Sequence, residues 1–101
     1  MKQPLKHQAT RKFWKLYNDL PVDIRGLADR NYELLKSDPK HPSLHFKNIE
    51  RNRWSVRIGL HYRALAFERG MVFTWVWIGP HEEYDRLTRA TGGHSTADKL
   101  L

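Results

Sequence analysis

The sequence predicts a single α+β domain, in which an N-terminal helical hairpin packs on one face of a small antiparallel β-sheet. Three observations support this prediction. The chain has 101 residues, its first half carries apolar residues at helical spacing, and its second half alternates with a period of two. A chain of this length forms one domain with one modest core. We place the domain at residues 1–91 and expect residues 92–101 to form a flexible tail.

The helical pattern follows a polar, basic arm at residues 1–9, which is poor strand material. Thr10 suits the N-cap of the first helix. The apolar positions after it recur at one helical face: Phe13, Leu16, Tyr17 and Leu20. Pro21 breaks this helix and suits the first turn of the next, which continues to about Lys36. The two helices share an apolar stripe that needs a partner surface.

The pattern then changes to a period of two. Leu44 and Phe46 alternate with polar neighbours, and this predicts a strand. In the next strand, apolar and polar residues alternate, and the polar positions are Arg53, Ser55 and Arg57. Because antiparallel sheets often expose one face to water, we expect Arg53 and Arg57 to be exposed on the same face.

Two more strands and a helix complete the predicted domain. Tyr62–Phe67 follows a turn at residues 59–61, and a tight turn at residues 68–70 leads into Met71–Ile78. Met71–Ile78 is apolar on both parities, which predicts an interior strand covered on both sides. Residues 81–90 are expected to form a short closing helix. The order of elements is therefore two helices followed by an antiparallel meander.

The charge balance points to a polyanionic partner. Eighteen Lys and Arg against eleven Asp and Glu give a net charge of +7, which favours nucleic acid first, an acidic protein second and a membrane surface third. Solubility alone is the alternative explanation. The chain has no cysteine, which excludes disulfides and a thiol nucleophile and fits a reducing cytoplasm. No apolar run reaches the ~20 residues of a membrane helix, and no signal peptide is expected.

Basic residues are predicted to gather on the polar face of the sheet. Lys47 precedes the strand that carries Arg53 and Arg57, and Arg63 lies just beyond the following hairpin. Neighbouring strands lie ~5 Å apart, so these cations can converge on a phosphate, for which arginine supplies a bidentate fork. The alternative is a solvated basic face with Glu50 or Glu68 as ion-pair partners.

The end of the last strand offers a titratable pair. His81 follows Gly79-Pro80, and Tyr84 lies three residues on, so the two would be neighbours in a helical turn. A capping His and a packing Tyr are the alternatives. The other histidines lack metal-ligand spacing, so no metal is expected. Trp75 and Trp77 would share one face of their strand; base stacking is conceivable there, and core packing is favoured.

Four short words in the sequence, taken in order after a helical hairpin, resemble the RelE/ParE superfamily of bacterial toxins. They are HPSLHFK (residues 41–47), WSVRIG (54–59), YRAL (62–65) and WIGPHEEYD (77–85). The resemblance is greatest to the HigB-like and RelE-like branch of type II toxin–antitoxin systems and covers residues 10–87. It implies a small α+β domain with helices on one sheet face and a basic, concave opposite face.

The resemblance also implies a function and a set of site residues. Such toxins are mRNA endoribonucleases that act on the ribosome, need no metal or other cofactor, and are held inactive by a cognate antitoxin. By its motifs, Arg63 would hold the scissile phosphate, Arg57 would stabilise the transition state, and His81 and Tyr84 would transfer protons or stack on a base. Lys47, Arg53 and Asp85 would assist in binding RNA or in orienting a neighbour.

Two alternative functions remain open for a chain with this resemblance. ParE-type members share the fold but inhibit DNA gyrase without cleaving RNA. A degenerate relative would bind RNA or a protein partner and cleave nothing. The His81 and Tyr84 positions favour the ribonuclease branch.

Overall fold

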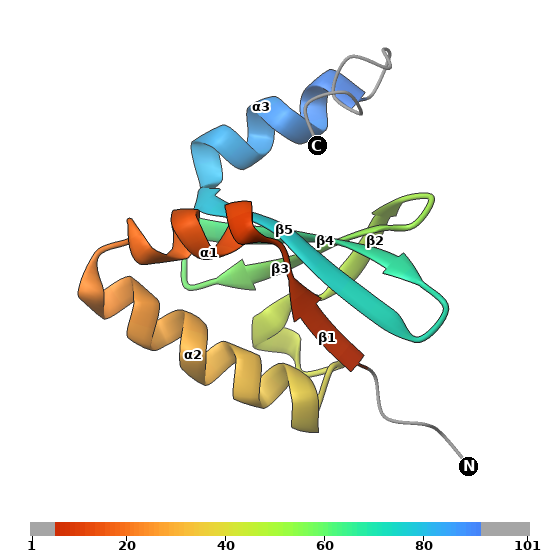
Figure 1. The fold of residues 1–101 in the computed structure, drawn as a ribbon, viewed down its shortest axis with the longest axis horizontal. Coiled ribbons are helices and arrows are strands. Elements are labelled where there is room, and N and C mark those ends of the chain that lie inside the picture. The colour runs from red at the N-terminus through yellow and green to blue at the C-terminus, as the bar shows by residue number, and fades with distance from the viewer. Residues whose placement is uncertain (1–5, 92–101) are drawn as a thin grey trace.

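The computed structural model describes residues 6–91, and the predicted tail at residues 92–101 lies outside them (Figure 1). A five-stranded sheet has the strand order β1-β5-β4-β3-β2. The elements in chain order are β1 (Lys6–Ala9), α1 (Arg11–Asn18), α2 (Val22–Ser37), a 3₁₀ turn (Pro42–Leu44), β2 (Lys47–Glu50), β3 (Arg53–Ile58), β4 (Tyr62–Arg69), β5 (Val72–Pro80) and α3 (His81–Thr91). The predicted α+β class is confirmed. No helix within this part of the chain is long and apolar enough to span a membrane.

The N-terminal segment differs from the sequence prediction. Residues 6–9, expected to belong to a basic arm, form β1, which pairs in parallel with β5 at the edge of the sheet. The sheet is therefore mixed, with an antiparallel meander from β2 to β5 and one parallel strand. A polar segment forms a strand here because His7 stacks on the rings of Phe73 and Trp75. The alternation of apolar and polar residues could not predict this strand, because histidine is treated as a polar residue in that pattern.

The helical hairpin is confirmed. Thr10 caps α1 by accepting a hydrogen bond from the Phe13 backbone amide at 3.1 Å, and α2 ends at Ser37, before Asp38 and Pro39. Figure 1 shows both helices beside the same sheet. Apolar side chains of each helix pack on a single core cluster: Phe13 and Leu16 of α1, and Ile24, Leu27 and Leu35 of α2.

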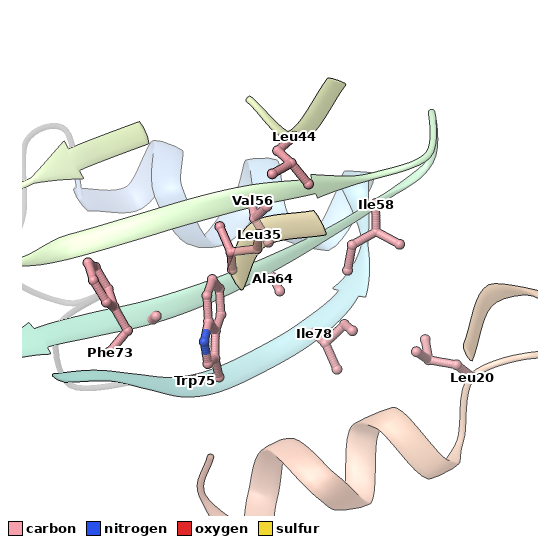
Figure 2. Packing of buried hydrophobic residues seen from close by; sticks show 10 residues of the cluster. Leu20, Leu35, Leu44, Val56, Ile58, Ala64, Phe73, Trp75 and Ile78 are labelled. Carbon is pink, nitrogen blue, oxygen red and sulfur yellow. The ribbon is translucent and has the colours of Figure 1, made fainter. Parts of the chain in front are cut away.

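The main core lies between these helices and the sheet. Buried side chains from β3, β4 and β5 line the helical face of the sheet, and Leu35 of α2 lies among them (Figure 2). The strand residues are Val56, Ile58, Ala64, Ala66, Phe73, Trp75 and Ile78. Leu44, with no exposed surface, fills one end of this layer. The helical hairpin is thereby fixed on one face, and the opposite face remains available for other groups.

A β-bulge in β5 changes which side chains reach each face. Trp75 lies opposite Ala66 and Trp77 lies opposite Leu65, so Val76 is an extra residue between two adjacent partners. Since Leu65 and Ala66 face opposite sides of the sheet, the two tryptophans do too. The prediction that Trp75 and Trp77 share a face is therefore wrong. Both rings are buried, as core packing requires.

The segment before β2 is also different from the prediction. Leu44 and Phe46 were expected to alternate within a strand, but residues 42–44 form a 3₁₀ turn and β2 begins at Lys47. His45 follows the turn in the left-handed backbone region, at φ 44° and ψ 45°. Two apolar residues that pack on the core and are separated by one polar residue give the same sequence pattern in either conformation, which explains the error.

Candidate functional site

The face of the sheet opposite the core carries two adjacent rows of side chains. One row crosses four strands and consists of Lys47, Ser55, Leu65 and Trp77. The next row consists of Arg57, Arg63 and Gly79. Because directly paired residues of an antiparallel sheet point to the same face, the register places Lys47, Arg57 and Arg63 on one face of the sheet.

The two arginines are held by backbone carbonyls at the end of the β3–β4 hairpin. Arg57 donates from Nε to the Gly59 carbonyl at 3.1 Å, and Arg63 donates from Nη1 to the Tyr62 carbonyl at 2.8 Å. Gly59 takes a positive φ of 63° that suits glycine and closes the hairpin. Each guanidinium has five donors, so both retain donors for an anion.

Helix α3 brings Tyr84 over this face. The Tyr84 hydroxyl donates a hydrogen bond to Oγ of Ser55 at 3.3 Å, and the Arg63 guanidinium lies 6.0 Å from the centre of the Tyr84 ring. Thr88 donates to the Tyr84 carbonyl at 2.9 Å. Three of the four residues predicted as catalytic, Tyr84, Arg63 and Arg57, therefore lie side by side on the sheet, and the contacts of the fourth, His81, are with Asp85 and the β3–β4 turn.

His81 and Asp85 form a pair of their own on the first turns of α3. Nδ1 of His81 lies 3.2 Å from a carboxylate oxygen of Asp85, and both side chains are partly exposed. The His81 backbone amide donates to the His61 carbonyl at 2.7 Å, which ties the start of α3 to the β3–β4 turn. Positions 81, 84, 85 and 88 follow the i, i+3, i+4, i+7 spacing of one helical face.

Arg53 lies on the predicted face, but its predicted exposure is wrong. Only 3% of the residue is exposed, and it pairs with Phe67 at the far end of β3 from the other arginines. Its carbonyl accepts a hydrogen bond from the Asn48 amide. Alternation places Arg53 on the correct side of the strand; it cannot show that this end of the face is covered.

Two further residues belong to the site that the sequence did not single out for it. Ser55 is buried and accepts the Tyr84 hydrogen bond. His45 places Nε2 at 3.4 Å from Nη1 of Arg57. Ser55 could have been found from its place between Arg53 and Arg57, among the polar positions of the alternating strand. The signal for His45 was its place between two apolar residues that are drawn into the core.

The opposite face holds a cavity of ≈ 170 Å³ between the helices and the sheet, lined mainly by apolar side chains. At its edge, Nδ1 of His7 accepts a hydrogen bond from Nε1 of Trp75 at 3.0 Å. Burial, and secondarily the charge of Lys36, lower the pKa of His7 below its usual 6.5. This cavity lies apart from the arginines. Within residues 6–91, no group of three His, Asp or Glu is placed to hold a metal ion.

We call the face of the sheet opposite the core the α3 face, because α3 brings Tyr84 over it. The arrangement of side chains on it fits the chemistry of a phosphodiester. Two guanidinium groups can neutralise a phosphate, a tyrosine ring can stack on a base, and the imidazole of His45 lies beside Arg57. Lys47 adds a further cation at the edge of the same face.

Comparisons with known proteins place the fold. No protein-family model matches the sequence, and no match was found among curated proteins. Among solved structures, a chain of the RelB–RelE antitoxin–toxin complex from Methanococcus jannaschii is similar to this one, with 20% identity and a TM-score of 0.62. The match covers 78% of this chain and 96% of the other.

Two bacterial structures give the same result. The toxin–antitoxin complex RelBE2 from Mycobacterium tuberculosis matches 78% of this chain and 100% of its own, with 18% identity and a TM-score of 0.61. A doubly substituted RelE toxin from E. coli in the free state matches over 88% of this chain and 96% of its own length, with 11% identity and a TM-score of 0.63. At these levels of identity the likeness is one of fold, and the fold of this chain is that of the RelE-like toxins.

Proposed function

We propose that this protein is the toxin of a type II toxin–antitoxin system and that it cleaves mRNA without a metal ion. The observation that carries the proposal is the cross-strand pair Arg57 and Arg63, with Tyr84 placed over it by α3. The RelE-like fold supports it, because the similar chains come from toxins, several in complex with an antitoxin. We therefore expect a cognate antitoxin partner.

The proposed reaction is an internal transesterification. The ribose 2′-hydroxyl attacks the adjacent phosphorus, the bond from phosphorus to the 5′-oxygen breaks, and the products are a 2′,3′-cyclic phosphate and a free 5′-hydroxyl. The transition state carries extra negative charge on the phosphoryl oxygens, and guanidinium donors aimed at them stabilise it. Arg63 holds the phosphate, and Arg57 stabilises the developing charge.

The groups on α3 complete the proposed site. His81, oriented by Asp85 at 3.2 Å, exchanges a proton with a reacting oxygen, and Tyr84 stacks on a flanking base. Ser55 fixes the direction of the Tyr84 hydroxyl. Lys47 binds a neighbouring phosphate at the sheet edge, where a compact ammonium group suffices. Arg53 is too buried for an RNA contact, and its role is in supporting the strand.

Inducible expression in a bacterial host, with primer extension on a reporter mRNA, tests the proposal. Wild type should arrest growth and produce discrete mRNA cuts. Arg63→Ala and His81→Ala should each reduce cleavage by ~10²–10³, the usual effect of losing one transition-state donor. Arg69→Ala is the matched control, because Arg69 is exposed at the far end of β4, and it should cleave like wild type.

Other outcomes would identify a different protein. Growth arrest with intact mRNA and altered DNA supercoiling would replace the ribonuclease with a gyrase inhibitor of the ParE type. No arrest would indicate a chain that only binds RNA or a partner. Repeating the assay on purified mRNA with and without ribosomes would show whether cleavage requires the ribosome.

A further inference from the structure

We infer that His45 is a catalytic residue, the general base that removes the proton from the attacking 2′-hydroxyl. This inference rests on the proposed ribonuclease function and deepens it, because the proposed reaction needs a base as well as an acid and His81 is the one imidazole assigned so far. It starts from the 3.4 Å approach of His45 Nε2 to Arg57 Nη1 and from the unusual backbone that produces it.

The backbone at His45 is fixed by its neighbours. Leu44 is completely buried, and Phe46 packs in a cluster of rings, with its centroid 4.8 Å from that of Trp54 and 5.4 Å from that of Phe73. The chain reverses direction between these two anchors, and His45 takes the left-handed conformation. Its amide donates to the Pro42 carbonyl. The side chain is thereby directed away from the core, toward Arg57.

A histidine at a left-handed position carries a cost. Glycine takes φ near +50° without strain, and asparagine, aspartate and histidine are the side chains found there most often, at a cost of order 1 kcal/mol or more. Nothing in the core requires an imidazole there, because the side chain is exposed. The ring of His45 meets an arginine of the candidate site and fills no place in the core, which points to a role outside stability.

The contact with Arg57 determines which nitrogen is free to accept a proton. A guanidinium has donors and no acceptor, so Nε2 of His45 must be the acceptor and must be unprotonated. The bond is long, and a phosphate bound to Arg57 would replace it. The lone pair of Nε2 would then face the group that Arg57 holds, as a general base requires.

His81 has the complementary arrangement. Nδ1 of His81 lies 3.2 Å from a carboxylate oxygen of Asp85. Asp85 supplies the counter-ion that an imidazolium needs. With His45 assigned as the base, His81 is left to supply the proton that the leaving oxygen needs, and the Asp85 carboxylate stabilises the imidazolium form that donates it.

The sheet places the two imidazoles on opposite sides of the arginines. His45 precedes β2 and His81 follows β5, while Arg57 and Arg63 lie on β3 and β4 between them. Displacement at phosphorus requires the attacking and leaving oxygens to be roughly in line. Nε2 of His45 takes the proton of the 2′-hydroxyl as the bond from O2′ to phosphorus forms. The 5′-oxygen leaves with the electron pair and receives a proton from His81.

Two substitutions at His45 separate proton transfer from support. His45→Asn suits the left-handed backbone and retains an acceptor for Arg57, but it cannot act as a base. His45→Gly also suits the backbone and leaves a space for free imidazole. Both variants should fold, and their melting temperatures should equal or exceed that of wild type. Cleavage of a reporter mRNA on purified bacterial ribosomes should fall by ~10²–10⁴ in each, the usual contribution of general base catalysis.

Added imidazole provides the specific readout. It should restore part of the cleavage by His45→Gly and none of that by Arg63→Ala, since a lost phosphate contact cannot be replaced by a base. Wild-type rates in His45→Asn would show that His45 only supports Arg57, and a failure of rescue in His45→Gly would likewise overturn the assignment. Intact mRNA with the wild-type protein would overturn the ribonuclease proposal itself, and this inference with it.

Discussion

The two faces of the sheet use the same central strands and differ in what they bury. The helical face is a continuous apolar layer in which the rings of Phe46, Trp54, Phe73 and Trp75 touch one another. The α3 face has a narrow apolar strip, Leu65 and Trp77, directly beside the row of Arg57 and Arg63. Stability is concentrated on one face and charge on the other, so substitutions on the two faces should affect different properties.

The largest expected effect on stability is that of Trp75→Ala. Trp75 is buried against His7 and Phe46 and donates a hydrogen bond to His7. Truncation of a buried tryptophan costs about 3–5 kcal/mol, a large part of the free energy of unfolding of a small domain. Urea denaturation followed by circular dichroism measures the loss. Trp14→Ala, at an exposed tryptophan of α1, should change the free energy of unfolding by much less.

A smaller effect is expected on the α3 face from Gly79→Ala. A Cβ at this position would lie 2.7 Å from the ring of Trp77, so the ring must move and the packing beside Arg63 must change. Such overpacking costs about 1–3 kcal/mol. In the comparison of the two faces, this variant should lose cleavage activity out of proportion to its loss of stability.

Gly26→Ala is the matched control for the glycine substitution. Gly26 lies within α2, and its added Cβ would make only an ordinary contact with Arg30 at 3.7 Å. Alanine is favoured over glycine inside a helix by about 0.5–1 kcal/mol, so this variant should be more stable than wild type. Equal losses in the two alanine variants would contradict the crowding at Trp77.

The smallest effect is a pH dependence of stability that arises on the helical face. Burial lowers the pKa of His7 below 6.5 in the folded protein, so the unfolded chain binds the proton more readily. The stabilisation is therefore complete above about pH 6.5 and is lost as the pH falls through that value toward the folded pKa. Protonation of Nδ1 would also remove the acceptor for Trp75.

Urea denaturation at about pH 7.5 and about pH 5.5 measures this dependence. His7→Phe keeps an aromatic ring against Phe73 and Trp75 and has no titrating group, so it should lose less stability over this interval than wild type. The same loss in both proteins would locate the pH dependence elsewhere in the chain.

The sequence predicted the elements with strong periodicity and missed those set by tertiary contacts. Helices α1 and α2 and strands β3 to β5 followed from spacing, because their apolar residues alone determine which face is buried. The bulge at Val76 shifts the alternation of β5 by one residue relative to β4, and nothing in the amino-acid composition of the strand marks its position. Strand β1 depends on rings contributed by β5, more than sixty residues away.

The candidate site shows the same division. Alternation along the strand predicted the face on which Arg57 lies, whereas Arg63 and Tyr84 were singled out by the motifs of the resemblance and lie beside it in the structure. Burial of Arg53 and the turn of His45 toward Arg57 depend on what covers or anchors the chain locally. Pattern gives the side of an element on which a residue lies, whereas exposure and partners require the assembled fold.

The parallel pairing of β1 with β5 delays the completion of the sheet while the protein is being synthesised. Gln8 and Thr74, which meet across that pairing, are separated by 66 positions in the chain. At the usual 5–20 residues per second, synthesis takes roughly 3–13 s to pass from one to the other. During that interval the first strand has no template, and the sheet that carries both arginines lacks an edge. A nascent chain therefore acquires its finished sheet only after β5 has been synthesised.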